Sequence, residues 1–258
     1  MTIVIENPQE FKNWRNANKG KTMGFVPTMG ALHVGHESLI RHAKNQNELV
    51  AISIYVNPTQ FDNKQDLQNY PQTWEADLKV AKQHKVDAIF APNYAAIYPD
   101  NYTYSVAENS ISKTLCGASR PGHFDGVLSV VLKLLNIVAP TRAYFGEKDF
   151  QQLTLIRGMA EAFFLDCEII GVPTVREKDG LAYSSRNQHL SAHGRVLAGQ
   201  INAIIKTAGD TNQASARLKS IGFEIDYIAD VFGRRLVAVK TNETKTGSAV
   251  RLIDNVEI

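Results

Sequence analysis

Short apolar runs alternate with longer amphipathic stretches along the chain up to about residue 172. The runs are typical of buried strands and lie at 23–27, 49–56, 86–91, 142–145 and 167–172. The stretches that place apolar residues on one helical face are 37–46, 75–84 and 149–164, and 127–138 is apolar all round like a buried helix. Continuous apolar strands separated by helices predict an α/β fold, a doubly wound parallel sheet covered on both faces.

The pattern changes after residue 172. The segment 177–187 is polar and predicts a loop, and 195–208 predicts a helix. Three strand candidates follow, at 225–232, 235–240 and 249–253. This order predicts a smaller C-terminal α+β domain over 174–258, after a first domain over 1–173.

Composition excludes several classes of protein. The 258 residues are 44% hydrophobic and carry a net charge of +2, so neither nucleic-acid binding nor membrane-surface binding is expected. No apolar run reaches 18 residues and none opens the chain, so neither a transmembrane helix nor a signal peptide is expected. The two cysteines, Cys116 and Cys167, suit a reducing compartment and predict a cytoplasmic protein.

The strongest local signal is PTMGALHVGH at 27–36, which follows a predicted strand and opens a predicted helix. Gly30 and Gly35 let the backbone approach an anion, and the start of the helix offers unpaired N–H groups. His33 and His36 can then donate hydrogen bonds to phosphates from one side of the helix. An H-x-x-H pair alone favours two surface histidines or half of a metal site, but this context reverses that preference. The segment resembles the HIGH signature of the nucleotidylyltransferase superfamily.

Two further segments carry groups suited to phosphates. Lys148, in YFGEKDFQQ at 144–152, is expected at a positive helix end suited to ATP, whereas Asp149 fits a helix cap and a ribose contact equally well. In the polar loop 175–187, two hydroxyls and a guanidinium make a mobile phosphate clamp or, alternatively, a solvated linker. After the first two signals, Ser184-Ser185-Arg186 resembles the KMSKS-type lid of the same superfamily.

Two other loops are more ambiguous. Gln60, in SIYVNPTQF at 53–61, is either a contact for a substrate hydroxyl or carboxylate or a turn residue that satisfies the backbone. Arg120 and His123 lie in a glycine-rich stretch before the buried helix. They either reach an anion or belong to an ordinary helix-entry loop.

Taken together, six segments resemble the pantoate–β-alanine ligase family, in its order and over almost the whole chain. They are GFVPTMGALHVGH, SIYVNPTQF, RPGHFDGV, AYFGEKDFQQL, GVPTVREKDGLAYSSRN and SAVRLIDN at 248–255. The chain departs from the family at Tyr183, where Leu or Met is usual, and in a shortened stretch at about 205–245.

The resemblance implies a Rossmann-like ATP- and pantoate-binding domain over 1–173 and a C-terminal lid domain over 174–258. It also implies an ATP-dependent ligase that joins pantoate to β-alanine through a pantoyl adenylate, releasing AMP and pyrophosphate. It implies that catalysis involves His36 as the usual proton donor, with His33, Lys148, Ser184, Ser185 and Arg186. The implied ATP-binding residues are Met29, Gly30, Ala31, Leu32, His33, Val34, Gly35, His36, Gly146, Glu147, Lys148, Asp149, Val175, Tyr183, Ser184, Ser185 and Arg186. Pantoate is expected at Gln60, Gln152, Asn57 and Arg120, with Gln60 also helping to place β-alanine. Mg²⁺ is expected on the phosphates, with Asp77 as a weak protein contact, and the protein is expected to be a homodimer.

Other functions remain open at this stage. A simple nucleotidylyltransferase with a small anionic acceptor shares the histidines and the Ser-Ser-Arg loop but does not need a pocket built from Gln60 and Gln152. A regulatory module would bind ATP without turnover. A nicotinamide dehydrogenase is disfavoured because no G-x-G-x-x-G lies in the first strand–turn–helix unit. A tRNA-charging enzyme is disfavoured by the near-neutral charge and by the lack of an anticodon-binding extension.

Overall fold

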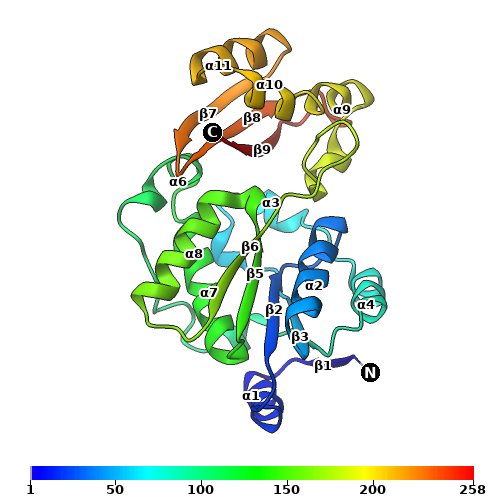
Figure 1. The fold of residues 1–258 in the computed structure, drawn as a ribbon, viewed down its shortest axis with the longest axis vertical. Coiled ribbons are helices and arrows are strands. Elements are labelled where there is room, and N and C mark those ends of the chain that lie inside the picture. The colour runs from blue at the N-terminus through cyan, green and yellow to red at the C-terminus, as the bar shows by residue number, and fades with distance from the viewer. Residues whose placement is uncertain (1) are drawn as a thin grey trace. The chain divides into compact units, whose positions relative to one another are not determined.

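The computed structural model describes residues 2–258, which divide into two compact units (Figure 1). The first unit runs to Gly146 and resumes over Gln151–Val172. The second unit contains Glu147–Phe150 and Pro173–Ile258. The segment Glu147–Phe150 is therefore grouped with the second unit, although the sequence pattern places it inside the first domain. The functional roles of the two domains stay predictions.

Within the described residues of the first unit, six parallel strands form one sheet in the order β1-β4-β3-β2-β5-β6. The strands are β1 Ile3–Ile5, β2 Met23–Thr28, β3 Leu49–Ile54, β4 Ala88–Phe90, β5 Arg142–Gly146 and β6 Glu168–Val172. The helices are α1 Pro8–Ala17, α2 Val34–Gln46, α3 Lys64–Gln68, α4 Trp74–Gln83, α5 Tyr94–Ile97, α6 Cys116–Ser119, α7 His123–Val138 and α8 Phe150–Ala162, with 3-10 turns η1 Pro58–Gln60 and η2 Ile111–Lys113. The doubly wound parallel sheet is confirmed.

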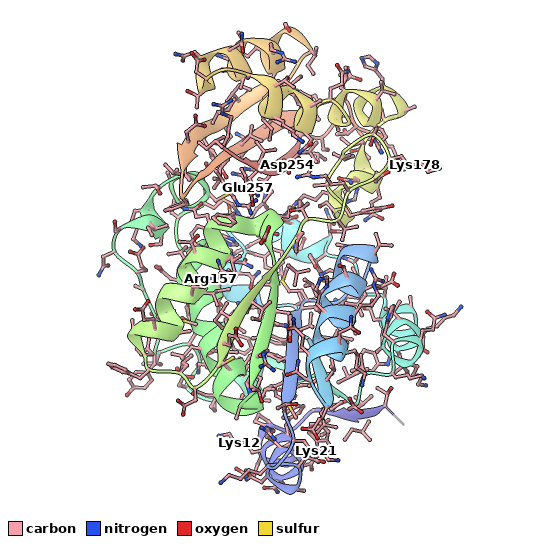
Figure 2. All side chains as sticks on the ribbon, in the orientation of Figure 1. Lys12, Lys21, Arg157, Lys178, Asp254 and Glu257 are labelled. Carbon is pink, nitrogen blue, oxygen red and sulfur yellow. The ribbon has the colours of Figure 1, made fainter. Side chains whose placement is uncertain are left out.

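Helices cover both faces of this sheet and bury its apolar strands. In Figure 1, α2 and α4 lie on one side of it and α7 and α8 on the other. Leu39 and Ile40 of α2 pack with Val26 and Ile52 of the central strands in one buried cluster. With all side chains drawn, both faces of the sheet are covered (Figure 2). This coverage is the reason that the strands read as continuous apolar runs.

The direction of winding reverses between β2 and β5. From β2 the chain winds outward through β3 and β4, whereas β5 and β6 extend the sheet on its other side. Ligands of open α/β sheets bind beyond the carboxyl ends of the strands at such a switch point. The loops that follow β2, β3 and β5 carry the histidine, glutamine and lysine signals, so the topology brings all three strand ends to one edge.

The second unit is built on an antiparallel sheet in the order β7-β8-β9, formed within the described residues by β7 Glu224–Val231, β8 Arg234–Thr241 and β9 Val250–Glu257. Its helices are α9 Ala192–Ala198, α10 Ile201–Thr207 and α11 Thr211–Ser220, with 3-10 turns η3 Glu147–Asp149 and η4 Ser185–His189. Ile205 of α10 and Leu218 of α11 pack on Val237 and Val239 of the sheet. The smaller α+β unit is thus confirmed.

One helix prediction in this unit is wrong. Residues 195–208 are not a single helix, because α9 ends before Gly199 and α10 begins at Ile201. A Cβ on Gly199 would lie 2.3 Å from Asp179 Oδ2, so the glycine at the break leaves room for the Asp179 carboxylate. Among residues 2–258, moreover, no helix is long and apolar enough to cross a membrane.

Candidate active site

The loop between β2 and α2 turns through two successive left-handed residues. The φ angle of Gly30 is 83° and that of Ala31 is 50°. An alanine in this region is strained, and such strain persists only where surrounding contacts hold it. Thr28 supplies one contact, since its Oγ1 accepts from Gly30 N at 3.1 Å and donates to Ser53 O at 2.6 Å.

Asp77 at the start of α4 holds the same turn from the other side. Its Oδ2 accepts from Ala31 N at 3.0 Å and from Thr73 Oγ1 at 3.1 Å, and its Oδ1 accepts from Leu32 N at 2.7 Å. The residue is only 2% exposed. This bonding commits the carboxylate to the loop and argues against the metal contact predicted for Asp77.

We expect Asp77→Asn to lower both thermal stability and the rate of ATP consumption. The amide replaces one acceptor with a donor that faces a backbone N–H, and a buried unsatisfied group costs about 1–3 kcal/mol. Unfolding curves and initial rates at rising Mg²⁺ check this, with Glu75→Gln as an exposed control on the same helix. Recovery of the rate at high Mg²⁺ would instead favour metal binding by Asp77.

His33 and His36 are locked by the start of α2. Nδ1 of His33 accepts from Gly35 N at 3.1 Å, and Nδ1 of His36 accepts from His33 N at 3.3 Å, forming a reciprocal cap. The ring centroids are 4.2 Å apart. Because each Nδ1 is an acceptor, the proton of each neutral ring lies on Nε2, where it can be donated to a phosphate oxygen.

Gly35 is required by this cap. A Cβ at that position would lie 2.8 Å from Cε1 and 3.0 Å from Nδ1 of His33. The glycine therefore admits the imidazole ring as well as any anion at the end of the helix.

The side chain of Asn57 is hydrogen-bonded to the side chain of Gln60. It is 1% exposed, and its Nδ2 donates to Gln60 Oε1 at 3.0 Å and to Gly126 O at 3.2 Å. Its Oδ1 accepts from Tyr98 Oη at 2.9 Å and from Thr59 Oγ1 at 3.0 Å. With its hydrogen-bonding groups used inside the protein, Asn57 is placed to orient Gln60, and this bonding argues against the predicted direct contact with pantoate.

Arg120 and His123 support Gln60 through its backbone. His123 Nδ1 bonds Gln60 O at 2.8 Å, and since a carbonyl only accepts, the proton lies on Nδ1. Nε2 of His123 then accepts from Arg120 Nη1 at 3.0 Å, while Arg120 Nε pairs with Asp62 at 3.1 Å. The guanidinium predicted to bind substrate thus has protein partners on this loop.

The two adjacent glutamines of α8 have different environments. Gln151 is 3% exposed, its Oε1 accepts from Cys116 N at 3.0 Å, and its Nε2 donates to the carbonyls of Ile111 and Thr114. Gln152 is only partly buried. Successive helical residues differ by about 100° in direction, so Gln152 does not share the inward direction of Gln151.

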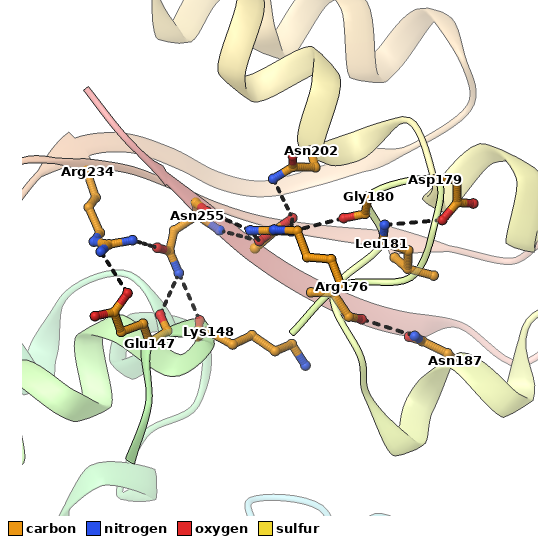
Figure 3. Close-up of polar contacts among 12 residues, drawn as sticks. Glu147, Lys148, Arg176, Asp179, Gly180, Leu181, Asn187, Asn202, Arg234 and Asn255 are labelled. Carbon is orange, nitrogen blue, oxygen red and sulfur yellow. Dashed lines mark hydrogen bonds and ion pairs between the residues drawn. The ribbon is translucent and has the colours of Figure 1, made fainter. Parts of the chain in front are cut away.

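In the second unit, the turn that carries Lys148 is held by the C-terminal strands (Figure 3). Asn255 Nδ2 donates to Glu147 O at 2.9 Å and to Lys148 O at 3.0 Å. Arg234 Nη2 pairs with Glu147 Oε2 at 2.9 Å, and its guanidinium lies 4.4 Å from the ring centroid of Phe150. Burial lowers the pKa of Lys148; Asp149 opposes that shift, and the nearby Arg186 adds to it.

The loop predicted as a phosphate clamp is an ordered turn. Tyr183 N donates to Val175 O at 3.0 Å, so two residues predicted at the nucleoside are neighbours. Ser184 Oγ accepts from Arg186 N at 3.3 Å and caps the turn that presents Ser185. The first unit therefore contains the two histidines and Gln60, and the second unit contains Lys148 and the Ser-Ser-Arg turn.

Comparisons with known proteins agree with this arrangement. The family model described as pantoate-beta-alanine ligase matches residues 3–257. A pantothenate synthetase of Bdellovibrio bacteriovorus is 58% identical over 258 residues, covering 100% of both chains. One of Legionella pneumophila is 45% identical over 98% of both chains. A crystal structure of pantoate-beta-alanine ligase from Francisella tularensis, complexed with beta-gamma ATP and beta-alanine, has a TM-score of 0.90 at 40% identity, covering 100% of this chain and 98% of that one.

The doubly wound sheet, with its histidine loop at the switch point, defines a nucleotide-binding α/β enzyme. The chain belongs to the pantoate–β-alanine ligase family. It is an ATP-dependent ligase that joins pantoate to β-alanine.

Proposed function

We propose that the ligation proceeds through a pantoyl adenylate. A carboxylate oxygen of pantoate bonds to the α-phosphorus of ATP, and the bond from that phosphorus to the bridging oxygen breaks, releasing pyrophosphate. The amine nitrogen of β-alanine then bonds to the acyl carbon, loses a proton and displaces AMP. Both acids are anionic, so the protein's main tasks are positioning and charge neutralisation.

The observation that carries this proposal is the pair of histidines with both Nδ1 atoms capped by backbone N–H groups. Each ring then offers Nε2–H to the departing pyrophosphate, with His36 as the principal donor. The start of α2 and the turn from Met29 to Leu32 add backbone N–H groups and the positive end of the helix dipole.

The second unit supplies the remaining charge. We assign Lys148, Ser184, Ser185 and Arg186 to the triphosphate, where they stabilise charge that moves onto pyrophosphate. The nucleoside side is assigned to Gly146, Glu147, Asp149, Val175 and Tyr183. The hydrogen bond between Tyr183 and Val175 supports this grouping.

Magnesium enters this scheme as the counterion of ATP. Among residues 2–258, no group of three His, Cys, Asp or Glu side chains is arranged to hold a metal ion, and Asp77 is committed to the loop. Mg²⁺ at nucleotide sites is held mainly by phosphate oxygens and waters, so we assign the ion to the phosphates of ATP.

We assign pantoate to Gln60 and Gln152, whose amides can pair with a carboxylate and a hydroxyl. Gln60→Ala and Gln152→Ala should each raise the apparent pantoate constant at least about tenfold, because an unpaired ligand group costs about 1–3 kcal/mol. ATP binding should change little. Titrating each ligand separately into the folded variants checks this, and equal weakening of both ligands would contradict the pocket.

The chemical course is tested by measuring AMP and pyrophosphate with ATP and pantoate, with and without β-alanine. We expect one equivalent of pyrophosphate without β-alanine, and steady AMP release only when it is present. A simple nucleotidylyltransferase would instead turn over continuously without β-alanine and accumulate an adenylylated product.

Assembly and location complete the proposal. We propose a homodimer in the cytoplasm, with small molecules and neither nucleic acid nor membrane as partners. The net charge of +2 supports the absence of nucleic-acid and membrane partners, and the two free cysteines support the cytoplasmic location. Sedimentation of the purified protein tests the dimer.

A further inference from the structure

Two adjacent residues of the last strand, Asp254 and Asn255 of β9, contact two separate loops of the second unit (Figure 3). Asn255 contacts the Glu147–Lys148 turn and Asp254 contacts Arg176. Successive residues of a strand point to opposite faces, which lets neighbours engage different partners. Asn255 is 2% exposed and Asp254 is 5% exposed, so both residues are buried.

Asn255 is fully used in holding the turn. Both hydrogens of Nδ2 go to the carbonyls of Glu147 and Lys148, and Oδ1 accepts from Arg234 Nη1 at 2.9 Å. Arg234 also pairs with Glu147 and lies over the ring of Phe150. The backbone of Lys148 is therefore held by Asn255 directly, while Arg234 contacts Glu147 just before it and Phe150 two residues after it.

Asp254 holds the second loop through a two-point ion pair. Arg176 Nη1 lies 2.7 Å from Oδ2, and Nη2 lies 2.9 Å from Oδ1. Arg176 also donates to Gly180 O at 3.0 Å, which closes the turn that returns to Tyr183 and the Ser-Ser-Arg segment. Asp254 is buried while Arg176 is partly exposed, so removing the arginine would leave a buried carboxylate without its partner, and this contact constrains the loop.

We propose that Asp254 and Asn255 are positioning residues for adenylate formation, Asn255 by fixing Lys148 and Asp254 by fixing the loop that carries Arg186. The inference rests on the phosphate roles proposed for Lys148 and Arg186. Neither Asp254 nor Asn255 touches a reacting atom. Small displacements of a group that stabilises transferred charge are costly, and about 1 Å can reduce a rate 10²-fold.

The test is a double-mutant cycle on full-length protein, read as pyrophosphate formed in a single turnover with ATP and pantoate. Asn255→Ala should slow this step about 10- to 100-fold, with a smaller change in the pantoate constant. In a Lys148→Ala background the same substitution should cost less than about twofold, because the group that Asn255 positions is gone. Asn212→Ala, an exposed asparagine of α11, is the matched control and should match the parent protein.

A purely structural role predicts the opposite pattern, with equal and additive losses in both backgrounds, and that result would overturn the inference. A wild-type rate for Asn255→Ala would overturn it as well. A wild-type rate for Lys148→Ala alone would contradict the proposed role of Lys148, and the inference would fall with it.

Two further variants keep the test decisive if Asn255→Ala does not fold. Arg234→Gln removes the ion pair to Glu147 while leaving Asn255 in place, and it should show the same non-additivity with Lys148→Ala. Asp254→Asn should slow adenylation, yet add little to the loss caused by Arg186→Ala. Additivity in both pairs rejects the positioning role.

Discussion

Replacing His36 with asparagine should lower the rate of pyrophosphate release about 10²- to 10³-fold while leaving the protein folded. The Oδ1 of asparagine can occupy the place of Nδ1 and still accept from His33 N, so the cap of α2 survives. The Nε2 donor is lost, and removing one preorganised donor to developing charge costs about 2.7–4 kcal/mol.

Glutamine at the same position is the matched comparison. Its Nε2 reaches farther and can replace the donor, whereas its fit to the capping position is poorer. We therefore expect His36→Gln to retain more adenylation activity and less thermal stability than His36→Asn. Single-turnover kinetics measure the adenylation activity, and unfolding curves measure the thermal stability. Near-normal pyrophosphate release by a folded His36→Asn variant would rule out the catalytic donor.

Lys148→Ala should slow adenylate formation about 10²- to 10³-fold and change pantoate affinity little, because the cation stabilises charge that moves to pyrophosphate. Lys148→Arg keeps a permanent charge and provides the control. Since burial lowers the pKa of Lys148, the parent enzyme should lose this cation at a pH below that of an ordinary lysine. The rate of the first step should then decline on the alkaline side in the parent and not in Lys148→Arg.

These profiles are measured from single turnovers with ATP below saturation, where the rate reports the free enzyme, between neutral and alkaline pH. An alkaline decline of equal position in both proteins would assign the titration to another group. Single-turnover adenylation at the parent rate in Lys148→Ala would contradict the phosphate role altogether.

The sheet and the glycine turns after its strands could be predicted from the sequence because their signals are local. Apolar runs mark strands buried on both faces, and the glycines at 30 and 35 mark the places where backbone or ring approaches closely. Residue type alone does not reveal which long-range partner a polar side chain has. In sequence, Asn57 and Arg120 look like ligand contacts. In the structure, Asn57 bonds to Tyr98, 41 positions away, and to Gly126, 69 positions away. Arg120 bonds to Gln60, 60 positions away.

The role of the last strand was missed for the same reason. Its SAVRLIDN segment stands out in sequence, but nothing in the pattern relates Asn255 to a turn 107 positions earlier. The predicted helix over 195–208 is wrong because the apolar periodicity continues through Gly199, whereas the structure interrupts the helix between α9 and α10.

The grouping of Glu147–Phe150 with the C-terminal residues has a consequence for dividing the gene into fragments. The chain passes between the two units at 146/147, at 150/151 and at 172/173. A fragment that begins at Pro173 would retain Arg234 and Asn255 but lack the carboxylate and the two carbonyls that they bind. A single cut therefore cannot excise the C-terminal unit intact, and the recombination of such modules between relatives must exchange both pieces together.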